Sequence, residues 1–278
     1  MQTDPTQNSN AEILLRCEGL NKTYTQGRWF SRSRLTKQVL KGVNLSIRAH
    51  STLALIGLSA SGKSTLARCL AGIEQPDSGE IWFEGTNLAG LSRREWDPFH
   101  RQIQMVFQEP AASLNPRLNG VELVSEPLLV AGMKKEERHR QALDLMELVG
   151  VPASCARRLP AELSGGQRRR LAIARALALA PKILVLDESL SGLDLSIQAQ
   201  ISNLLITLQA ARHLTYICIS HDLDLVAHLA DEVAVLHEGQ IVEVGSPAEL
   251  LAAGPSSRPI SRFQEAAAKL NKLQVGLP

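Results

Sequence analysis

The chain carries a complete phosphate-binding loop, and this motif constrains its fold more than any other feature. Residues 57–64 match the pattern G-x-x-x-x-G-K-S. The two glycines let the backbone curl so that successive N–H groups point into one concavity suited to a di- or triphosphate. Lys63 adds a positive charge and the Ser64 hydroxyl adds a Mg²⁺ ligand. The residues expected to surround the phosphates are Gly57, Leu58, Ser59, Ala60, Ser61, Gly62, Lys63, Ser64 and Thr65.

The neighbouring segments support this interpretation. The apolar run at residues 52–56 predicts a buried strand, and residues 65–71 have helical spacing that ends at Gly72. A glycine-rich turn that binds nothing is the alternative, and the order strand, loop, helix disfavours it.

Composition bounds the class of protein. The 278 residues allow one large domain, or one domain with a subdomain, and 44% hydrophobic with 21% charged residues is ordinary for a globular chain. A net charge of +2 gives no argument for nucleic acid as a partner. The sequence has no apolar stretch of about 18 residues and no secretory signal at its start. The scattered cysteines, Cys17, Cys69, Cys155 and Cys218, predict reduced buried thiols rather than disulfides or a metal site.

The periodicity along the chain predicts an α/β core interrupted by a helical insert. Strand patterns occupy residues 13–20, 38–47, 79–85, 103–107, 182–186 and 215–220, and a hairpin joins 233–236 to 241–244. Helical patterns occupy residues 121–131, 134–149, 167–180 and 195–211, and a further helix starts near 246–249. We therefore expect a disordered lead at 1–11, a domain at 12–250 with a helical subdomain at 109–164 between core segments 12–108 and 165–250, and a tail at 251–278.

A second motif also faces an anion. Residues 163–167 read Leu-Ser-Gly-Gly-Gln, in which Ser164 and Gln167 form the pattern of a capping box before an apolar helix. Capping alone does not call for Gly165 and Gly166 in the first turn, because glycine weakens a helix. The two glycines permit another group to approach bare N–H groups at a helix N-terminus. The chain thus offers two phosphate sites, which need not serve one nucleotide within one chain.

Together these segments resemble the ATP-binding cassette (ABC) ATPases over roughly residues 12–250, with residues 163–167 matching the signature pentapeptide of that family. The resemblance implies an α/β phosphate-loop NTPase (RecA-like) core with an antiparallel β subdomain and an inserted α-helical subdomain. It implies ATP and Mg²⁺ as cofactors. It also implies that Ser164, Gly165, Gly166 and Gln167 contact ATP held by a partner chain.

Two carboxylates follow an apolar strand, where ligands sit in α/β folds. Asp187 can orient the Mg²⁺ shell, and Glu188 can polarise the water that attacks the γ-phosphate; two solvated acids are the plainer alternative. The resemblance adds Gln108 as a sensor of Mg²⁺ and water and His221 as a contact to the γ-phosphate, although a lone histidine at a strand end is usually structural. It adds Asp194 in a loop at the dimer interface and Tyr24 as the aromatic that stacks on adenine, where a surface tyrosine is the plainer alternative. The chemistry implied is phosphoryl transfer to water.

Residues 105–110, 113–117 (Ser-Leu-Asn-Pro-Arg) and 126–128 resemble the ATPases of oligopeptide, dipeptide and nickel importers. Three departures stand out: Ala60 replaces a glycine common in the loop of the family, Ser189 follows Glu188 where proline is usual, and the tail lacks the cysteine cluster of many peptide-importer ATPases. The last departure favours no iron–sulfur cluster and weights the cargo toward nickel or another small solute.

The resemblance implies two transmembrane permease subunits, a second ABC ATPase subunit that is a different chain or a second copy, and an external solute-binding protein. It implies a peripheral location on the cytoplasmic face of the plasma membrane and no nucleic acid partner. An exporter ATPase, an ABC ATPase of DNA repair or translation, and a regulatory subunit with little turnover remain the alternatives. The membrane helices, zinc-ligand insertions and coiled coils of the first two are not seen in the sequence, and Glu188 and His221 argue against the third.

Overall fold

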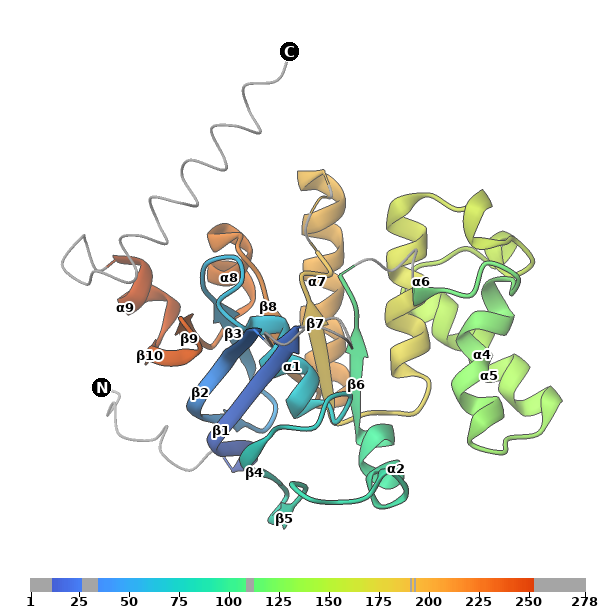
Figure 1. Ribbon diagram of the computed structural model, residues 1–278. Helices are drawn as coiled ribbons and strands as arrows, with labels where there is room; N and C mark the ends of the chain where they lie inside the picture. Colours follow the sequence, from blue (N-terminus) through green and yellow to red (C-terminus); the bar gives the residue numbers. More distant parts are fainter. Residues whose placement is uncertain (1–11, 27–34, 109–112, 191, 193, 253–278) are drawn as a thin grey trace, which may run out of the picture.

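The computed structural model describes residues 12–26, 35–108, 113–190, 192 and 194–252, which form two sheets surrounded by helices (Figure 1). The residues outside the described ranges are the expected disordered lead at 1–11, residues 27–34 and 109–112, Ser191, Leu193, and residues 253–278 of the tail. None of the helices in the described ranges combines the length and the apolar composition that a membrane-spanning helix requires.

The smaller sheet is antiparallel, with strand order β2-β1-β4-β5. Its strands are β1 (Ile13–Gln26), β2 (Leu35–Arg48), β4 (Ser78–Phe83) and β5 (Thr86–Asn87). Both β1 and β2 are longer than the apolar runs predicted, because their polar ends continue to pair up to Gln26 and Leu35. Cross-strand pairing therefore extends strands beyond the residues whose burial made them recognisable.

The larger sheet has the order β10-β9-β3-β8-β7-β6. Its strands are β3 (Thr52–Ile56), β6 (Ile103–Val106), β7 (Ile183–Asp187), β8 (Thr215–Ile219), β9 (Glu232–His237) and β10 (Gln240–Gly245). All neighbours are parallel except β10, which pairs antiparallel with β9 as the hairpin signal predicted. The carboxyl ends of β3, β6, β7 and β8 consequently meet at one edge.

Alternate residues of the large sheet enter different cores. Ile183 and Val185 of β7 pack into a cluster shared with the antiparallel sheet, whereas Leu184 and Leu186 pack against the helices of the opposite layer. The strand is buried on both faces, which is why it reads as a continuous apolar run. The four cysteines are buried and unpaired, as predicted.

The helices are α1 (Lys63–Leu70), α2 (Arg93–Gln102), α4 (Gly120–Val130), α5 (Lys135–Leu148), α6 (Gly165–Leu177), α7 (Leu195–Arg212), α8 (Leu223–Leu229) and α9 (Pro247–Ala252), with 3-10 turns at Ala153–Cys155 and Pro160–Glu162. No sequence pattern predicted α2 and α8. Helix α2 is polar and buries only Trp96, so its apolar periodicity is weak, but a capping box of Ser92 and Glu95 starts it.

Helices α4 and α5 pack on each other and on α6, to one side of the large sheet (Figure 1). The buried side chains of these three helices, such as Leu123, Leu145 and Leu171, belong to the same cluster as Leu186 of β7. The insert is thus joined to the core through a continuous apolar interior, with α6 as the shared element.

Candidate nucleotide site

The phosphate loop lies between β3 and α1, at the carboxyl edge of the large sheet, as the sequence predicted. Gly57 follows β3 and lies close to the backbone of β9. A Cβ atom at this position would lie 2.2 Å from the carbonyl oxygen of Leu236. Glycine is therefore required there by packing. Ala60 lies exposed at the turn of the loop and has a φ of +64°, in the left-handed region.

Lys63 begins α1 and turns its ammonium group back over the loop. Its Nζ donates hydrogen bonds to the carbonyl oxygens of Gly57 at 2.8 Å and of Leu58 at 3.0 Å. The side chain is buried, and this burial lowers the pKa of Lys63, with Glu188 and Asp187 opposing the shift. The ammonium group of Lys63 is therefore held against the backbone of the phosphate loop.

Ser64 and Asp187 come together from different elements. The Ser64 hydroxyl of α1 donates to Oδ1 of Asp187, at the end of β7, across 3.0 Å. Asp187 is only 3% exposed, and burial raises the pKa of its carboxyl despite this hydrogen bond. A hydroxyl beside a desolvated carboxylate is the hard oxygen donor set that Mg²⁺ prefers, so these residues fit the cation that the motif implies.

Three further predicted residues converge next to this pair. Nε2 of Gln108, after β6, donates to Oε2 of Glu188 at 2.8 Å. Nδ1 of His221, after β8, lies 3.9 Å from Oε1 of the same carboxylate. Glu188 has a φ of +42°, and its N–H donates to the carbonyl of Ile219, which holds this uncommon conformation in place. The carboxylate thus lies between an amide and an imidazole at the sheet edge.

Tyr24 of β1 lies beside the phosphate loop. Its hydroxyl donates to Oε1 of Glu74 at 2.5 Å and lies 3.4 Å from the Thr65 hydroxyl oxygen. Desolvation, followed by the hydrogen bond to Glu74, raises the pKa of Tyr24. Glu74 was not identified from the sequence, since no motif marks a carboxylate that anchors an aromatic ring.

The signature segment forms the predicted capping box. The Ser164 hydroxyl accepts from the N–H of Gln167 at 3.2 Å, and the Gln167 side chain accepts from the N–H of Ser164 at 2.9 Å. A Cβ atom on Gly165 would meet nothing within 4 Å, whereas one on Gly166 would lie 3.2 Å from Cγ2 of Ile197. Gly166 is therefore explained by contact within the chain, and only Gly165 leaves open space for another group.

Asp194 begins α7 as its N-cap, accepting from the N–H of Ile197 at 2.9 Å. The next residue, Leu195, is 83% exposed. In the part of the chain that is described, no hydrogen bond links Ser164, Gly165, Gly166 or Asp194 to the phosphate loop. One chain thus assembles the loop, the carboxylates, Gln108, His221 and Tyr24, and leaves the signature residues apart from them.

A phosphate loop, two carboxylates at the next strand end, a glutamine, a histidine and a separate signature helix define an ABC ATPase. The family model described as "ABC transporter" matches residues 40–191, and the chain belongs to this family. Members of the family hydrolyse ATP to drive transport, and this chain is an ATP-binding cassette of that kind.

Among curated relatives, the chain is 43% identical over 247 residues to a probable peptide ABC transporter ATP-binding protein of Sinorhizobium fredii, covering 88% of this chain and 70% of the relative. It is 44% identical to an oligopeptide transport ATP-binding protein of Mycobacterium tuberculosis, covering 88% of this chain but 40% of that relative. A di/tripeptide transport ATP-binding protein of Pseudomonas aeruginosa is 42% identical, with 88% and 76% covered.

Solved structures give the same class. A dimeric ATP-binding cassette in a post-hydrolysis state, bound to ADP and Pi, matches with a TM-score of 0.76 at 29% identity, covering 84% of this chain and 99% of that one. The cbiO1 protein of Clostridium perfringens, part of an ABC transporter complex, matches with a TM-score of 0.74 at 28% identity, covering 93% and 99%. The predicted α/β phosphate-loop NTPase fold is confirmed.

Proposed function

We propose that this chain is the ATPase subunit of an importer for oligopeptides or dipeptides, and that it works on the cytoplasmic face of the plasma membrane. The observation that carries the proposal is Glu188 held between Gln108 and His221, next to a complete phosphate loop. The cargo class rests on the relatives, which are named for peptide, oligopeptide and di/tripeptide transport. Nickel, the other cargo considered from the sequence, has no such support.

In the proposed reaction, Glu188 orients the water that attacks the γ-phosphate. Gln108 holds Oε2 of the carboxylate, which leaves Oε1, on the side of His221, to accept a hydrogen bond from the water. In the same proposal, His221 donates to an oxygen of the γ-phosphate. Lys63 exchanges its carbonyl partners for phosphate oxygens, and the fixed positions of these groups supply most of the catalysis.

Ser64, Asp187 and Gln108 are the residues that would hold Mg²⁺. The bound cation would neutralise charge on the β- and γ-phosphates. Asp187 is preorganised for this role because Ser64 already fixes one of its oxygens. In this proposal the ring of Tyr24, whose hydroxyl lies beside Thr65 and donates to Glu74, stacks on the adenine base.

We propose that two ATPase chains pair so that Ser164 and Gly165 of each contact the nucleotide of the other. The open space at Gly165 and the exposed Leu195 beside Asp194 fit a surface that a second chain covers. A matching cassette structure is dimeric, which supports pairing with a second copy or with a related chain.

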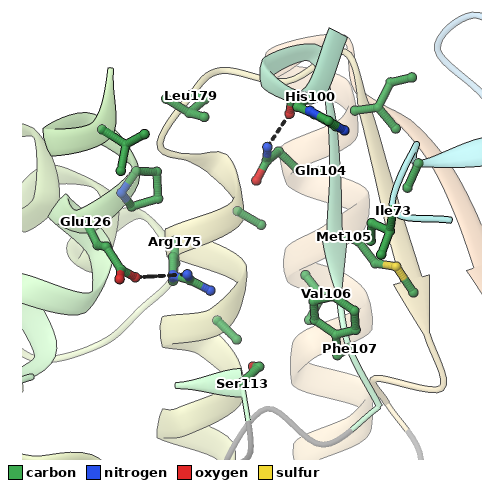
Figure 2. A pocket seen from close by; sticks show the side chains of 16 residues that line it. Ile73, His100, Gln104, Met105, Val106, Phe107, Ser113, Glu126, Arg175 and Leu179 are labelled. Carbon is green, nitrogen blue, oxygen red and sulfur yellow. Dashed lines mark hydrogen bonds and ion pairs between the residues drawn. The ribbon is translucent and has the colours of Figure 1, made fainter. Parts of the chain in front are cut away.

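We propose that a groove of about 410 Å³ between the core and the insert receives a helix of a permease subunit. Figure 2 shows Met105, Val106 and Phe107 of β6 and its continuation on one side, and Glu126 of α4 paired with Arg175 of α6 on the other. Because Phe107 directly precedes Gln108, pressure on this wall can change the position of the glutamine that holds Glu188. Two such chains would engage two permeases.

The test is to recover the tagged full chain from detergent-solubilised native membranes and to measure peptide-stimulated ATP hydrolysis. Two permeases, a second ATPase and hydrolysis that requires Lys63 are expected, and Lys63→Ala should abolish tight ATP binding. Recovery of ribosomes or DNA-repair proteins would overturn the transport assignment and leave the ATPase intact. Unchanged ATP affinity of the Lys63→Ala variant would contradict the nucleotide site itself.

A further inference from the structure

The first turn of α7 contacts two motifs of the proposed site within the same chain. Asp194 caps this turn, and its carbonyl accepts from the N–H of Gln198 at 2.9 Å. Ile197 packs against Gly166 of the signature helix. Gln198 reaches in another direction, where its Nε2 donates to Oδ2 of Asp222 at 2.6 Å.

Asp222 is the residue after His221, and both of its carboxylate oxygens are engaged. Oδ1 accepts from the N–H groups of Asp224 and Leu225 and caps α8, while Oδ2 accepts from Gln198. Its own N–H donates to the hydroxyl of Ser220, the residue after β8. The backbone next to His221 is therefore held by the Ser220 hydroxyl and by the cap of α8. Its link to α7 is the hydrogen bond from the Gln198 side chain.

We propose that Gln198 is a positioning residue that holds His221 against Glu188 and makes this placement depend on the Asp194 end of α7. This inference rests on the proposed function for the roles of Glu188 and His221. The imidazole lies 3.9 Å from the carboxylate, so a shift of less than about 1 Å in residues 221–222 makes or breaks that contact. If the first turn of α7 moves, the hydrogen bond from Gln198 shifts Asp222 with it. The same movement shifts Gly166 through its contact with Ile197.

The hydrogen bond can be removed by Gln198→Met and rebuilt in a double variant, and both of these changes keep the net charge of the pair. Gln198→Met keeps the length of the side chain and deletes the donor. Gln198→Glu places a carboxylate against Asp222, which repels it. Combining Gln198→Glu with Asp222→Asn restores the hydrogen bond in the opposite direction, because the amide at position 222 now donates to the carboxylate at position 198. Asp222→Asn alone is the matched control, because asparagine still caps α8 and the Gln198 amide can turn over to accept.

The experiment measures ATP hydrolysis by the full chain with the subunits that co-purify from native membranes. Gln198→Met and Gln198→Glu should each lower kcat about tenfold while KM for ATP and Tm stay near wild type. The double variant should recover to the level of Asp222→Asn. Wild-type kcat in Gln198→Glu, or no recovery in a double variant of normal Tm, overturns the proposal.

Amide hydrogen exchange tests the same link without hydrolysis, so it separates this proposal from the proposed function. Gln198→Glu should speed exchange at the N–H groups of Asp222, Asp224 and Leu225, and the double variant should slow it again. Unchanged exchange at these amides contradicts the inference even if the chain proves to be an importer ATPase. Absence of ATP hydrolysis in the wild type, with the expected exchange pattern, counts against the proposed function alone.

Discussion

At the scale of single residues, Ala60 holds a backbone conformation that glycine adopts more readily. Its φ of +64° strains an L-residue, and its side chain is exposed, so no packing offsets the strain. Ala60→Gly should raise the free energy of unfolding by about 0.5–1 kcal/mol. Urea unfolding of the two proteins measures the difference. A destabilised glycine variant would contradict the strained geometry.

The ionised carboxylate of Asp187 has opposite effects on the stability of the fold and on the binding of Mg²⁺. Because burial raises its pKa in the folded chain, the ionised carboxylate destabilises the fold at neutral pH. This penalty shrinks as the pH falls below the raised pKa, and it is gone below the ordinary pKa of an aspartate. Asp187→Asn, which can still accept from Ser64, should therefore be more stable than wild type at neutral pH and lose that advantage as the pH is lowered. Urea unfolding from neutral pH downward measures this trend, and Mg²⁺-dependent ATP binding should fall in the same variant.

Most residues of the proposed site lie at or just after the end of a strand of the parallel sheet, from which Asp187 and Glu188 were predicted, whereas Gln108 and His221 were predicted from the family resemblance. Asp187, Glu188, Gln108 and His221 meet since β6, β7 and β8 are neighbours that end at one edge. Glu74 and Gln198 could not be predicted this way. Each acts through a contact across 24 to 50 residues that no local pattern encodes.

At the scale of elements, the two glycines at the start of α6 differ in their surroundings: Gly166 contacts Ile197, whereas Gly165 faces open space. Gly165→Ala adds a methyl group into free space, so the fold should keep its stability within about 0.5 kcal/mol. If Gly165 faces the nucleotide of a second chain, hydrolysis should nevertheless fall at least about tenfold.

Gly166→Ala is the comparison, since its methyl group would lie 3.2 Å from Cγ2 of Ile197. This side chain must then move by a few tenths of an ångström, and the free energy of unfolding should fall by about 1 kcal/mol. Thermal unfolding and ATPase rates of the two variants distinguish these effects. Full hydrolysis in the Gly165→Ala variant would remove this glycine from the shared site.

Elements with strong periodicity were predicted within a few residues, and those shaped by context were not. Strand β3 runs over the predicted residues 52–56, and α4 and α5 differ by one residue at each end. Helix α2 escaped prediction because it buries only Trp96, which fills the space above Gly72. The tertiary contact, rather than an apolar stripe, defines that helix.

At the scale of the whole molecule, we expect ATP hydrolysis by Glu188 to control how long two chains stay paired. Glu188→Gln retains a hydrogen-bonding side chain but loses the charge that orients water, so hydrolysis should fall by about 10²–10⁴-fold while ATP binding persists. The nucleotide then stays between two chains, and a dimer should accumulate. Size-exclusion chromatography with ATP measures this, and Lys63→Ala is the control that should remain monomeric. A variant that turns over at the wild-type rate would remove Glu188 from its role.

The insert and the core share one apolar cluster, which runs from Leu145 of α5 through Leu171 of α6 to Tyr216 of β8. Because this cluster is continuous across the two parts, we expect the described domain to unfold in one transition rather than as separate subdomains. Coincident denaturation curves from fluorescence and circular dichroism are the expected result. Two separated transitions would show that α4 and α5 fold independently.

The burial of all four cysteines makes the chain convenient for spectroscopic labelling. Burial raises the pKa of Cys17, Cys69 and Cys218 to about 12, and thiols react as thiolates, so maleimide dyes should leave the native residues unmodified. A cysteine introduced at the exposed Leu195 would then be the only reactive thiol. Energy transfer between dyes on two subunits could follow their approach and separation during turnover, without removal of any native cysteine.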